Sequence, residues 1–205
     1  MIGILDLDIG NLRSLSNAIY SLGYDFTLVA NDSHFEELTH LVIPGVGAYA
    51  TAMRHADERG LREPVKAFAG SGKPVLGICL GMQLLSSWGD EAGGAHGFGI
   101  VPGKVVQMEP GAGLNLPHVG WNGALLQREH PAFRGLKTGR DFYFVHSYHF
   151  VCDEPADALA RTDYGIPFTS IVGRDNVLGL QFHPEKSQGN GLKLLENFCK
   201  WNGRC

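Results

Sequence analysis

The stretch Pro74–Gln83, PVLGICLGMQ, decides the fold that we expect for the whole chain. Residues 74–78 form a short apolar run, which is typical of a strand buried in a parallel sheet. This run passes without a loop into residues 80–88, for which we predict a helix. A strand that leads straight into a helix is the repeating unit of a parallel sheet with helices on its faces.

The residues before this stretch repeat the same alternation. Gly23 ends one helical pattern, and the cap-like sequence Asn31-Asp32-Ser33 opens a short helix. We predict strands over 2–5, 26–29 and 41–43, the last one broken by Pro44-Gly45, and helices over 11–22, 47–59 and 64–69.

The residues after it are richer in extended runs. We predict strands over 101–108, 142–150, 158–162, 169–172 and 177–182, and an amphipathic closing helix over 192–201. No repeat or linker interrupts the chain, so we expect a single domain over residues 1–205. The predicted fold class is α/β, with an open, mostly parallel twisted sheet, helices on both faces and an antiparallel extension.

Composition and charge exclude several classes of function. The formal net charge of −4 gives no basic footprint for nucleic acid, and no apolar run approaches the roughly 20 residues of a membrane span. The four cysteines show no metal-like spacing, so we expect free thiols, no metal and no cofactor. We recognise no signal peptide ahead of the first strand and expect a cytoplasmic protein.

Cys79 is the candidate nucleophile. Gly77 and Gly81 flank it in the pattern G-x-nucleophile-x-G, in which glycines allow a turn too tight for a β-carbon. A cysteine at a helix N-terminus meets the positive end of the helix dipole, which favours the attacking thiolate. On this segment alone, a small cysteine buried in the core is the alternative interpretation.

A base and a group to orient it occur together in Phe182-His183-Pro184-Glu185, directly after an apolar strand. Glu185 can accept a hydrogen bond from one ring nitrogen of His183, which leaves the other nitrogen to face the thiol. A loop without a catalytic role is the alternative. The presence of the Cys79 elbow in the same chain favours the catalytic interpretation.

Two further segments supply candidate ligand contacts. Because glycines let backbone N–H groups point at a ligand, we expect Gly45, Val46 and Gly47 to contribute to an oxyanion hole, together with Leu80 beside the nucleophile. A simple strand-to-helix turn is the alternative for this segment. Gln83 lies one turn into the predicted helix, where it is either solvated or hydrogen-bonded to an amide or carboxylate substrate.

The segments Gly77–Gln83 and Phe182–Glu185 resemble, in the same order, the motifs of the triad (class I) glutamine amidotransferases, and the resemblance extends over the chain. It implies a flavodoxin-like fold with Cys79 as nucleophile, His183 as general base and acid, and Glu185 as the residue that orients His183. It also implies that glutamine forms a γ-glutamyl thioester on Cys79, which water then hydrolyses.

The same resemblance implies contacts to the substrate glutamine. Gln83 matches a residue that binds it, and Gly47 belongs to the wall of the same site. Ser147 and Tyr148 match the segment whose backbone holds the α-amino and carboxylate groups.

Longer motifs are similar to those of one subfamily, the glutaminase subunits of imidazole glycerol phosphate synthase. They are Pro44-Gly45-Val46-Gly47, Pro117-His118-Val119-Gly120-Trp121-Asn122 and His183-Pro184-Glu185-Lys186-Ser187. This similarity implies a heterodimer with a (β/α)8-barrel cyclase, which uses the ammonia to make imidazole glycerol phosphate and an aminoimidazole carboxamide ribotide in histidine biosynthesis.

The subfamily also implies which residues face the cyclase and how it controls the glutaminase. Asn11, Trp121 and Lys186 match its docking face. Glutamine hydrolysis is expected to be slow until the cyclase is loaded, when the backbone of Gly45-Val46-Gly47 reorients to complete the oxyanion hole.

One departure from the subfamily lies near the docking face. Many members carry Asp-Tyr-Gly ahead of Gly-Asn, where this chain has Asp6-Leu7-Asp8-Ile9-Gly10-Asn11. The main alternative is therefore a paralogous glutaminase that feeds another synthase, such as a sugar amination step in surface-polysaccharide synthesis. A cysteine peptidase and a non-catalytic binding protein are further alternatives. Glu185 and the long family motifs argue against the peptidase, and the complete Cys–His–Glu set argues against the non-catalytic protein.

Overall fold

The structure, a computed structural model, describes residues 1–9 and 12–205. Its described strands form one branched sheet of 13 strands with a parallel centre. The parallel strands lie in the order β2 (Phe26–Val29), β1 (Ile2–Leu5), β3 (His40–Gly45), β4 (Val75–Cys79) and β13 (Val177–Leu180). The C-terminal ends of β3 and β4 meet where Gly45 pairs with Cys79, so the two predicted ligand-binding turns lie side by side.

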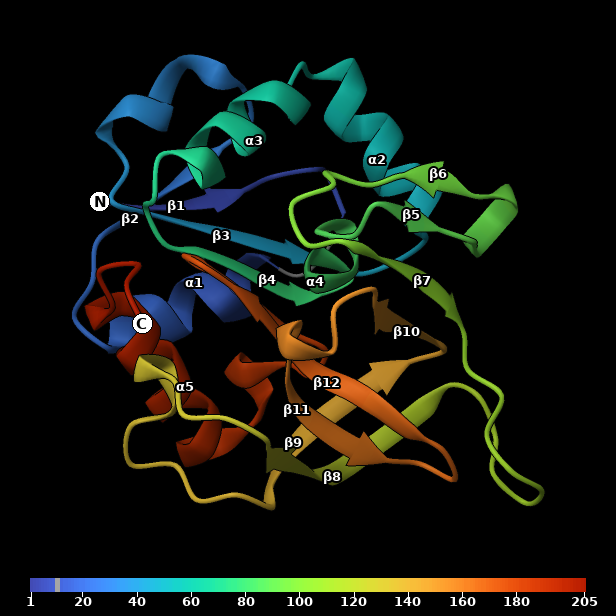
Figure 1. Ribbon diagram of the computed structural model, residues 1–205. Coiled ribbons are helices and arrows are strands. Elements are labelled where there is room, and N and C mark those ends of the chain that lie inside the picture. Colours follow the sequence, from blue (N-terminus) through green and yellow to red (C-terminus); the bar gives the residue numbers. More distant parts are fainter. Residues whose placement is uncertain (10–11) are drawn as a thin grey trace.

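Beyond β13 the sheet becomes mostly antiparallel. The order continues through β12 (Pro167–Arg174), β10 (Tyr148–Cys152), β7 (Gly103–Gln107), β5 (Trp88–Gly89) and β6 (Ala95–His96). A branch leaves β12 through β11 (Ala158–Asp163), β8 (His118–Leu126) and β9 (Arg140–His146). Figure 1 shows this branch below the parallel strands.

Helices cover both faces of the parallel half (Figure 1). One face carries α2 (Tyr49–Glu58) and α3 (Arg62–Gly70), and the other carries α1 (Leu12–Ser21) and α5 (Gln188–Lys200). Successive residues of β3 enter two separate cores, Leu41 and Ile43 one and Val42 the other, as expected for a strand that is buried on both sides. The predicted fold class, including the antiparallel extension, is confirmed.

Short helices complete the chain. The α-helix α4 (Leu80–Leu84) follows Cys79 directly. The 3₁₀ helices are η1 (Asp32–Glu37), η2 (Glu91–Gly93), η3 (Pro131–Phe133), η4 (Pro155–Asp157) and η5 (Pro184–Lys186). In η1 the side chain of Asn31 accepts a hydrogen bond from the Ser33 backbone, which confirms the predicted cap.

Several predicted boundaries differ from the structure. Strand β3 continues through Pro44 because it pairs with β4 up to Gly45. Helix α4 ends at Leu84 rather than Trp88, because Trp88 and Gly89 pair with β6 and β7. The extended run 142–150 is two strands in different parts of the sheet, with Ser147 between them. The closing helix begins at Gln188, four residues before its predicted start at Leu192.

Strand β8 was not predicted as a strand. Its sequence contains Gly120, Asn122 and Gly123, which are all poor strand formers. The strand forms nevertheless because β9 and β11 pair with it on its two sides. No helix in the described part of the chain is both long and apolar enough to cross a bilayer.

Candidate active site

The predicted elbow forms at the junction of β4 and α4. Cys79 has φ 54° and ψ −111°, a conformation that costs a residue with a side chain on the order of 1–3 kcal/mol. A β-carbon on Gly77 would lie 2.6 Å from the carbonyl oxygen of Gly81, and one on Gly81 would lie 1.6 Å from that of Ile43. Both glycines are therefore required by close backbone approach, and they hold the Cys79 side chain at the end of the strand.

His183 and Glu185 lie next to the elbow, at the start of η5. The Nδ1 atom of His183 is 2.8 Å from Oε1 of Glu185, and both side chains are buried. The Nε2 atom is also buried and has no hydrogen-bond partner among the described residues. The carboxylate thus fixes one side of the imidazole, and the other side is free for proton exchange with a neighbour.

The pKa of His183 reflects its two neighbours. Burial is the largest single influence and lowers this pKa, but Cys79 and Glu185 together outweigh burial and raise the pKa to about 9. At neutral pH the site therefore favours an imidazolium between a sulfur and a carboxylate. Such an imidazolium can serve as a proton donor beside the candidate nucleophile.

Sequence reasoning missed the residues that hold the His183 loop in place. Ser187 is fully buried, donates a 2.6 Å hydrogen bond to the His183 carbonyl and accepts one of 2.9 Å from the Tyr143 backbone. Gly191 allows α5 to approach the loop, since a β-carbon there would lie 1.9 Å from the Pro184 oxygen. Only the tertiary structure shows these roles. Tyr143 lies on β9, far from the His183 motif in the sequence, and Gly191 lies on α5, which follows that motif.

A cavity of about 500 Å³ opens beside the Cys79 sulfur. The turn after β3 forms one wall, where Gly47 adopts φ +104° and Val46 is 41% exposed. Leu80 lies on the elbow side of the same cavity. The structure therefore brings the predicted oxyanion residues Val46, Gly47 and Leu80 to one cavity, and Gly45 pairs with Cys79 immediately behind it.

Gln83 also lines this cavity but is not solvated. Its Nε2 atom donates to the Tyr148 carbonyl at 3.1 Å and to Oε1 of Gln181 at 3.0 Å. Gln181 is fully buried and directs its own amide nitrogen to the Cys79 sulfur, 3.9 Å away. Gln181 was not predicted, although it lies two residues before His183 on the same run of chain.

The other predicted substrate residues, Ser147 and Tyr148, form the opposite wall together with His146. They lie where the chain passes from β9 to β10. The Ser147 carbonyl accepts a 2.9 Å hydrogen bond from the Met108 backbone, which anchors this crossing to the end of β7. Seven of the predicted site residues thus line one cavity: Val46, Gly47, Cys79, Leu80, Gln83, Ser147 and Tyr148.

The predicted docking residues lie on an outer surface near the cavity. Trp121 on β8 is 48% exposed, and its ring packs against that of Tyr143 with centroids 6.0 Å apart. The Lys186 ammonium lies 5.9 Å from the centre of the same Tyr143 ring. Asn11, the third predicted docking residue, lies outside the described residues.

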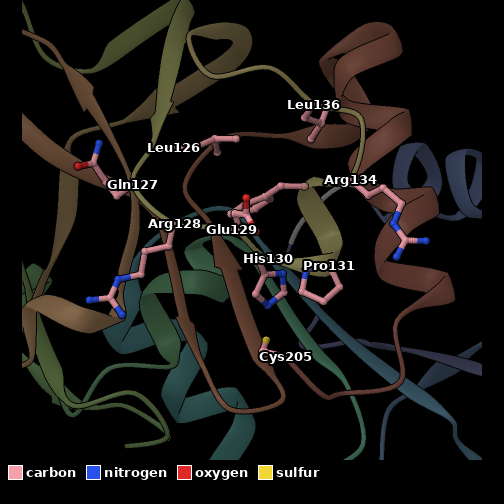
Figure 2. A pocket seen from close by; sticks show the side chains of 10 residues that line it. Leu126, Gln127, Arg128, Glu129, His130, Pro131, Arg134, Leu136 and Cys205 are labelled. Carbon is pink, nitrogen blue, oxygen red and sulfur yellow. The ribbon is translucent and has the colours of Figure 1, made fainter.

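A larger cavity, about 790 Å³, lies elsewhere, between residues 126–136 and Cys205. Figure 2 shows that the charged ends of Arg128 and Arg134 extend away from one another, so they do not converge on a ligand. None of the predicted site residues lines this cavity. We therefore place the candidate active site in the smaller cavity at Cys79. Among the described residues, no group of three or more His, Cys, Asp or Glu side chains is arranged to hold a metal ion.

Comparisons with known proteins identify the family of this chain. The class-I glutamine amidotransferase family matches residues 4–201, and the chain belongs to this family. Solved structures of similar fold include a glutamine amidotransferase, with a TM-score of 0.76 at 22% identity over 97% of both chains. Another is PurLQS from Thermotoga maritima, with a TM-score of 0.77 at 18% identity over 97% of both chains.

Curated relatives narrow the family further. The chain is 48% identical to the imidazole glycerol phosphate synthase subunit HisH of Sulfurimonas denitrificans, over 98% of both proteins. It is 47% identical to HisH of Desulfitobacterium hafniense over 98% of this chain and 94% of that protein. It is 44% identical to HisH of Aquifex aeolicus over 95% of this chain and 94% of that protein. The chain is similar to HisH proteins over nearly its whole length.

Proposed function

We propose that the chain hydrolyses glutamine to glutamate and ammonia at Cys79, as the glutaminase subunit of an imidazole glycerol phosphate synthase. The observation that carries the proposal is the arrangement of His183. Its Nδ1 is bonded to Glu185 at 2.8 Å, its Nε2 has no hydrogen-bond partner among the described residues, and its pKa is raised by the adjacent cysteine and carboxylate.

The first step is attack of the Cys79 thiolate on the carboxamide carbon of glutamine. The C–N bond breaks, the His183 imidazolium gives its proton to the departing nitrogen, and ammonia leaves a γ-glutamyl thioester on the sulfur. Backbone N–H groups of Leu80 and of the turn Gly45–Gly47 stabilise the oxyanion of the tetrahedral intermediate.

The second step hydrolyses the thioester. Neutral His183 takes a proton from water through Nε2, the hydroxide adds to the thioester carbon, and the C–S bond breaks to release glutamate and restore the thiolate. Glu185 holds the imidazole in one tautomer and stabilises the imidazolium in both steps. The free carboxylate and amino groups of glutamine contact the backbone of Ser147 and Tyr148, and Gln83 adds a side-chain contact.

An exposed apolar stripe on β8 supports a protein partner. Val119, Trp121 and Leu125 are 55%, 48% and 51% exposed and point to the same side of the strand. Across the pairing with β9, Val145 and Tyr143 lie beside the first two of these residues. We assign this stripe and Lys186 to the interface with a (β/α)8-barrel cyclase, whose substrate receives the ammonia.

The names of the relatives favour the histidine-pathway cyclase over the paralogous synthase as the acceptor of ammonia. In this proposal the loaded cyclase turns the backbone of the Gly45–Gly47 segment to complete the oxyanion hole. Gly47 already has a positive φ that disfavours any side chain, and Val46 is exposed in the turn.

The test is a glutaminase assay with the chain alone, with the cyclase subunit, and with the cyclase plus its nucleotide ligand. We expect slow ammonia release from the chain alone and a large increase in the loaded complex. Equal rates in all three conditions would contradict the gating, and no glutamate under any condition would contradict the proposed activity.

A further inference from the structure

Two buried histidines beside the glutamine cavity have no role in the chemistry described so far. His146 ends β9 and lines the cavity, and His118 begins β8 directly opposite it in the strand register. Burial lowers the pKa of His146 to about 3 and that of His118 to about 4. Both imidazoles are therefore neutral at physiological pH, so each has one nitrogen that donates and one that accepts.

The hydrogen bonds fix which nitrogen carries each proton. The Nδ1 atom of His146 lies 2.8 Å from the Tyr148 carbonyl oxygen, which only accepts, so this nitrogen is the donor. The Nε2 atom of His146 must then accept, and it lies 3.1 Å from Nδ1 of His118. His118 therefore donates from Nδ1, and its Nε2 faces the side-chain amide of Asn122 at 3.4 Å.

Aromatic contacts hold His118 in this orientation. Its ring stacks on that of Tyr164, with centroids 4.0 Å apart and 24° between the planes, and on that of Phe144 at 5.0 Å and 22°. Asn122 is held in turn, because its Nδ2 donates to the Asp163 carbonyl at 2.8 Å. The imidazole of His118 thus has little freedom to rotate, and the donor that it presents to His146 is preorganised.

At its other end the chain of hydrogen bonds reaches the substrate wall. The Tyr148 carbonyl accepts from His146 and also from Nε2 of Gln83. The His146 bond spans Ser147, where the backbone leaves one part of the sheet for another, so it fixes the shape of this crossing. The Nε2 atom of Gln83 donates to Tyr148 and Gln181, so the side-chain carbonyl of Gln83 is the group that remains available to a ligand.

We propose that His146 and His118 are positioning residues for glutamine: they hold the Ser147–Tyr148 backbone and the Gln83 side chain in the geometry that binds the substrate. This inference rests on the proposed function of the same cavity. It assigns the histidine pair to substrate binding and leaves the bond-breaking steps to Cys79 and His183. Loss of the pair therefore raises KM for glutamine more than it lowers kcat.

The test compares three substitutions of His146 in the complex with the cyclase. The amide of Asn lies near the position of Nδ1 and keeps the donor to Tyr148, whereas the longer Gln reaches toward Nε2 and His118. Leu removes both bonds. We expect KM for glutamine to rise about tenfold in His146→Gln and His146→Leu, the effect of losing one buried hydrogen bond, and to stay near wild type in His146→Asn.

His149→Leu is the matched control. His149 lies on β10, the next strand along the chain, its ring also packs near Phe168, and its buried Nδ1 has no hydrogen-bond partner in the described part of the chain. We expect unchanged KM in this variant. Synthesis driven by added ammonium salt is measured for every variant, because it reports on folding and assembly independently of the glutamine site.

Equal KM values in His146→Asn and His146→Gln, or a wild-type KM in both, would overturn the proposal. The comparison of His146→Asn with His146→Gln tests the proposal even if His146→Leu does not fold, since both new side chains are polar and similar in size to histidine. A rise in KM for His149→Leu equal to that of His146→Gln would also overturn it. Absence of glutamine hydrolysis in the wild-type complex would instead contradict the proposed function.

Discussion

Two histidine sites lie at the candidate active site, His183 beside Cys79 and His146 in the wall of the cavity, and their neighbours differ. His183 and His146 are 3% and 6% exposed, so burial lowers the pKa of each. Cys79 and Glu185 reverse that effect at His183 and raise its pKa to about 9. His146 faces a carbonyl and a neutral imidazole, and its pKa stays at about 3.

The difference shows that the partners, rather than the depth of burial, decide what a buried histidine does. A histidine whose neighbours raise its pKa above neutral holds a proton that can be transferred. A histidine between a carbonyl and another imidazole has a fixed tautomer, and it serves as a directional hydrogen-bond donor. We assign proton transfer to the first site and substrate geometry to the second.

The strongest test of the charged site removes its nucleophile. Cys79→Ala should reduce glutamine-dependent synthesis by the complex to background, because no other described cysteine lines the cavity. Synthesis from added ammonium salt should stay within about twofold of wild type, since the proposed acceptor site lies in the partner subunit. The two rates are measured on the same preparation, and loss of both would indicate misfolding or a wrong assignment.

Glu185→Gln removes the negative charge of the carboxylate but keeps the size of the side chain. We expect kcat for glutamine hydrolysis to fall about a hundred- to ten-thousandfold, as for other triads that lose their carboxylate. The imidazolium is lost as pH rises through its pKa, so the wild-type activity should decline above pH of about 9. The alkaline limb of the variant should lie at lower pH, because one of the groups that raise the His183 pKa is gone. An alkaline limb at the same pH in the variant and in wild type would contradict the role of Glu185.

Lys186→Ala changes the residue next to Glu185 without touching the His183–Glu185 bond. Lys186 is exposed and lies over the Tyr143 ring beside Trp121. We expect the Kd for the cyclase to rise about fivefold, as for a charge at the rim of an interface, with little change in intrinsic glutaminase rate. Lys66→Ala on α3 is the control, an exposed lysine on the opposite face of the sheet. Equal Kd values for the two variants would remove Lys186 from the interface.

The two histidine sites should also give opposite slopes of stability with pH. The pKa of His183 is raised in the folded chain, so its contribution to the free energy of unfolding is complete below pH 6.5 and is lost as pH rises through about 9. The pKa of His146 is lowered, so folding loses stability as pH falls below 6.5 toward about 3.

Each slope is at most about 1.4 kcal/mol per pH unit for one proton. Denaturant unfolding across the two pH windows measures them. Glu185→Gln should flatten the alkaline slope only, and His146→Asn should flatten part of the acid slope only. His118, His130, His40 and His149, whose pKa values burial also lowers, contribute to the remaining acid slope.

The charged site was predictable because its determinants are local. Gly77 and Gly81 are needed within a single turn, and His183 and Glu185 are two residues apart, so short motifs contain the information. The parallel half of the fold was predictable for a similar reason, since each buried strand is a continuous apolar run followed by a helix.

The neutral site was not predictable from such patterns. His118 and His146 meet only because β8 pairs with β9 in one register. The sequence of β8 contains glycines and an asparagine, which are more typical of a loop than of a strand. Gln181 and Ser187 are similar cases. Their partners are Gln83, the Cys79 sulfur and the Tyr143 backbone, which the tertiary structure alone brings together.

The most direct test of Cys79 as the nucleophile locates the atom that a reactive glutamine analogue modifies. The complex is treated with a diazo ketone that has the glutamine backbone, and the adduct is located by mass spectrometry of peptides. We predict one adduct, on Cys79, that excess glutamine prevents and that Glu185→Gln slows. Modification at Cys152, Cys199 or Cys205 instead, or no adduct on a complex that releases ammonia from glutamine, would contradict the assignment of Cys79 as the nucleophile.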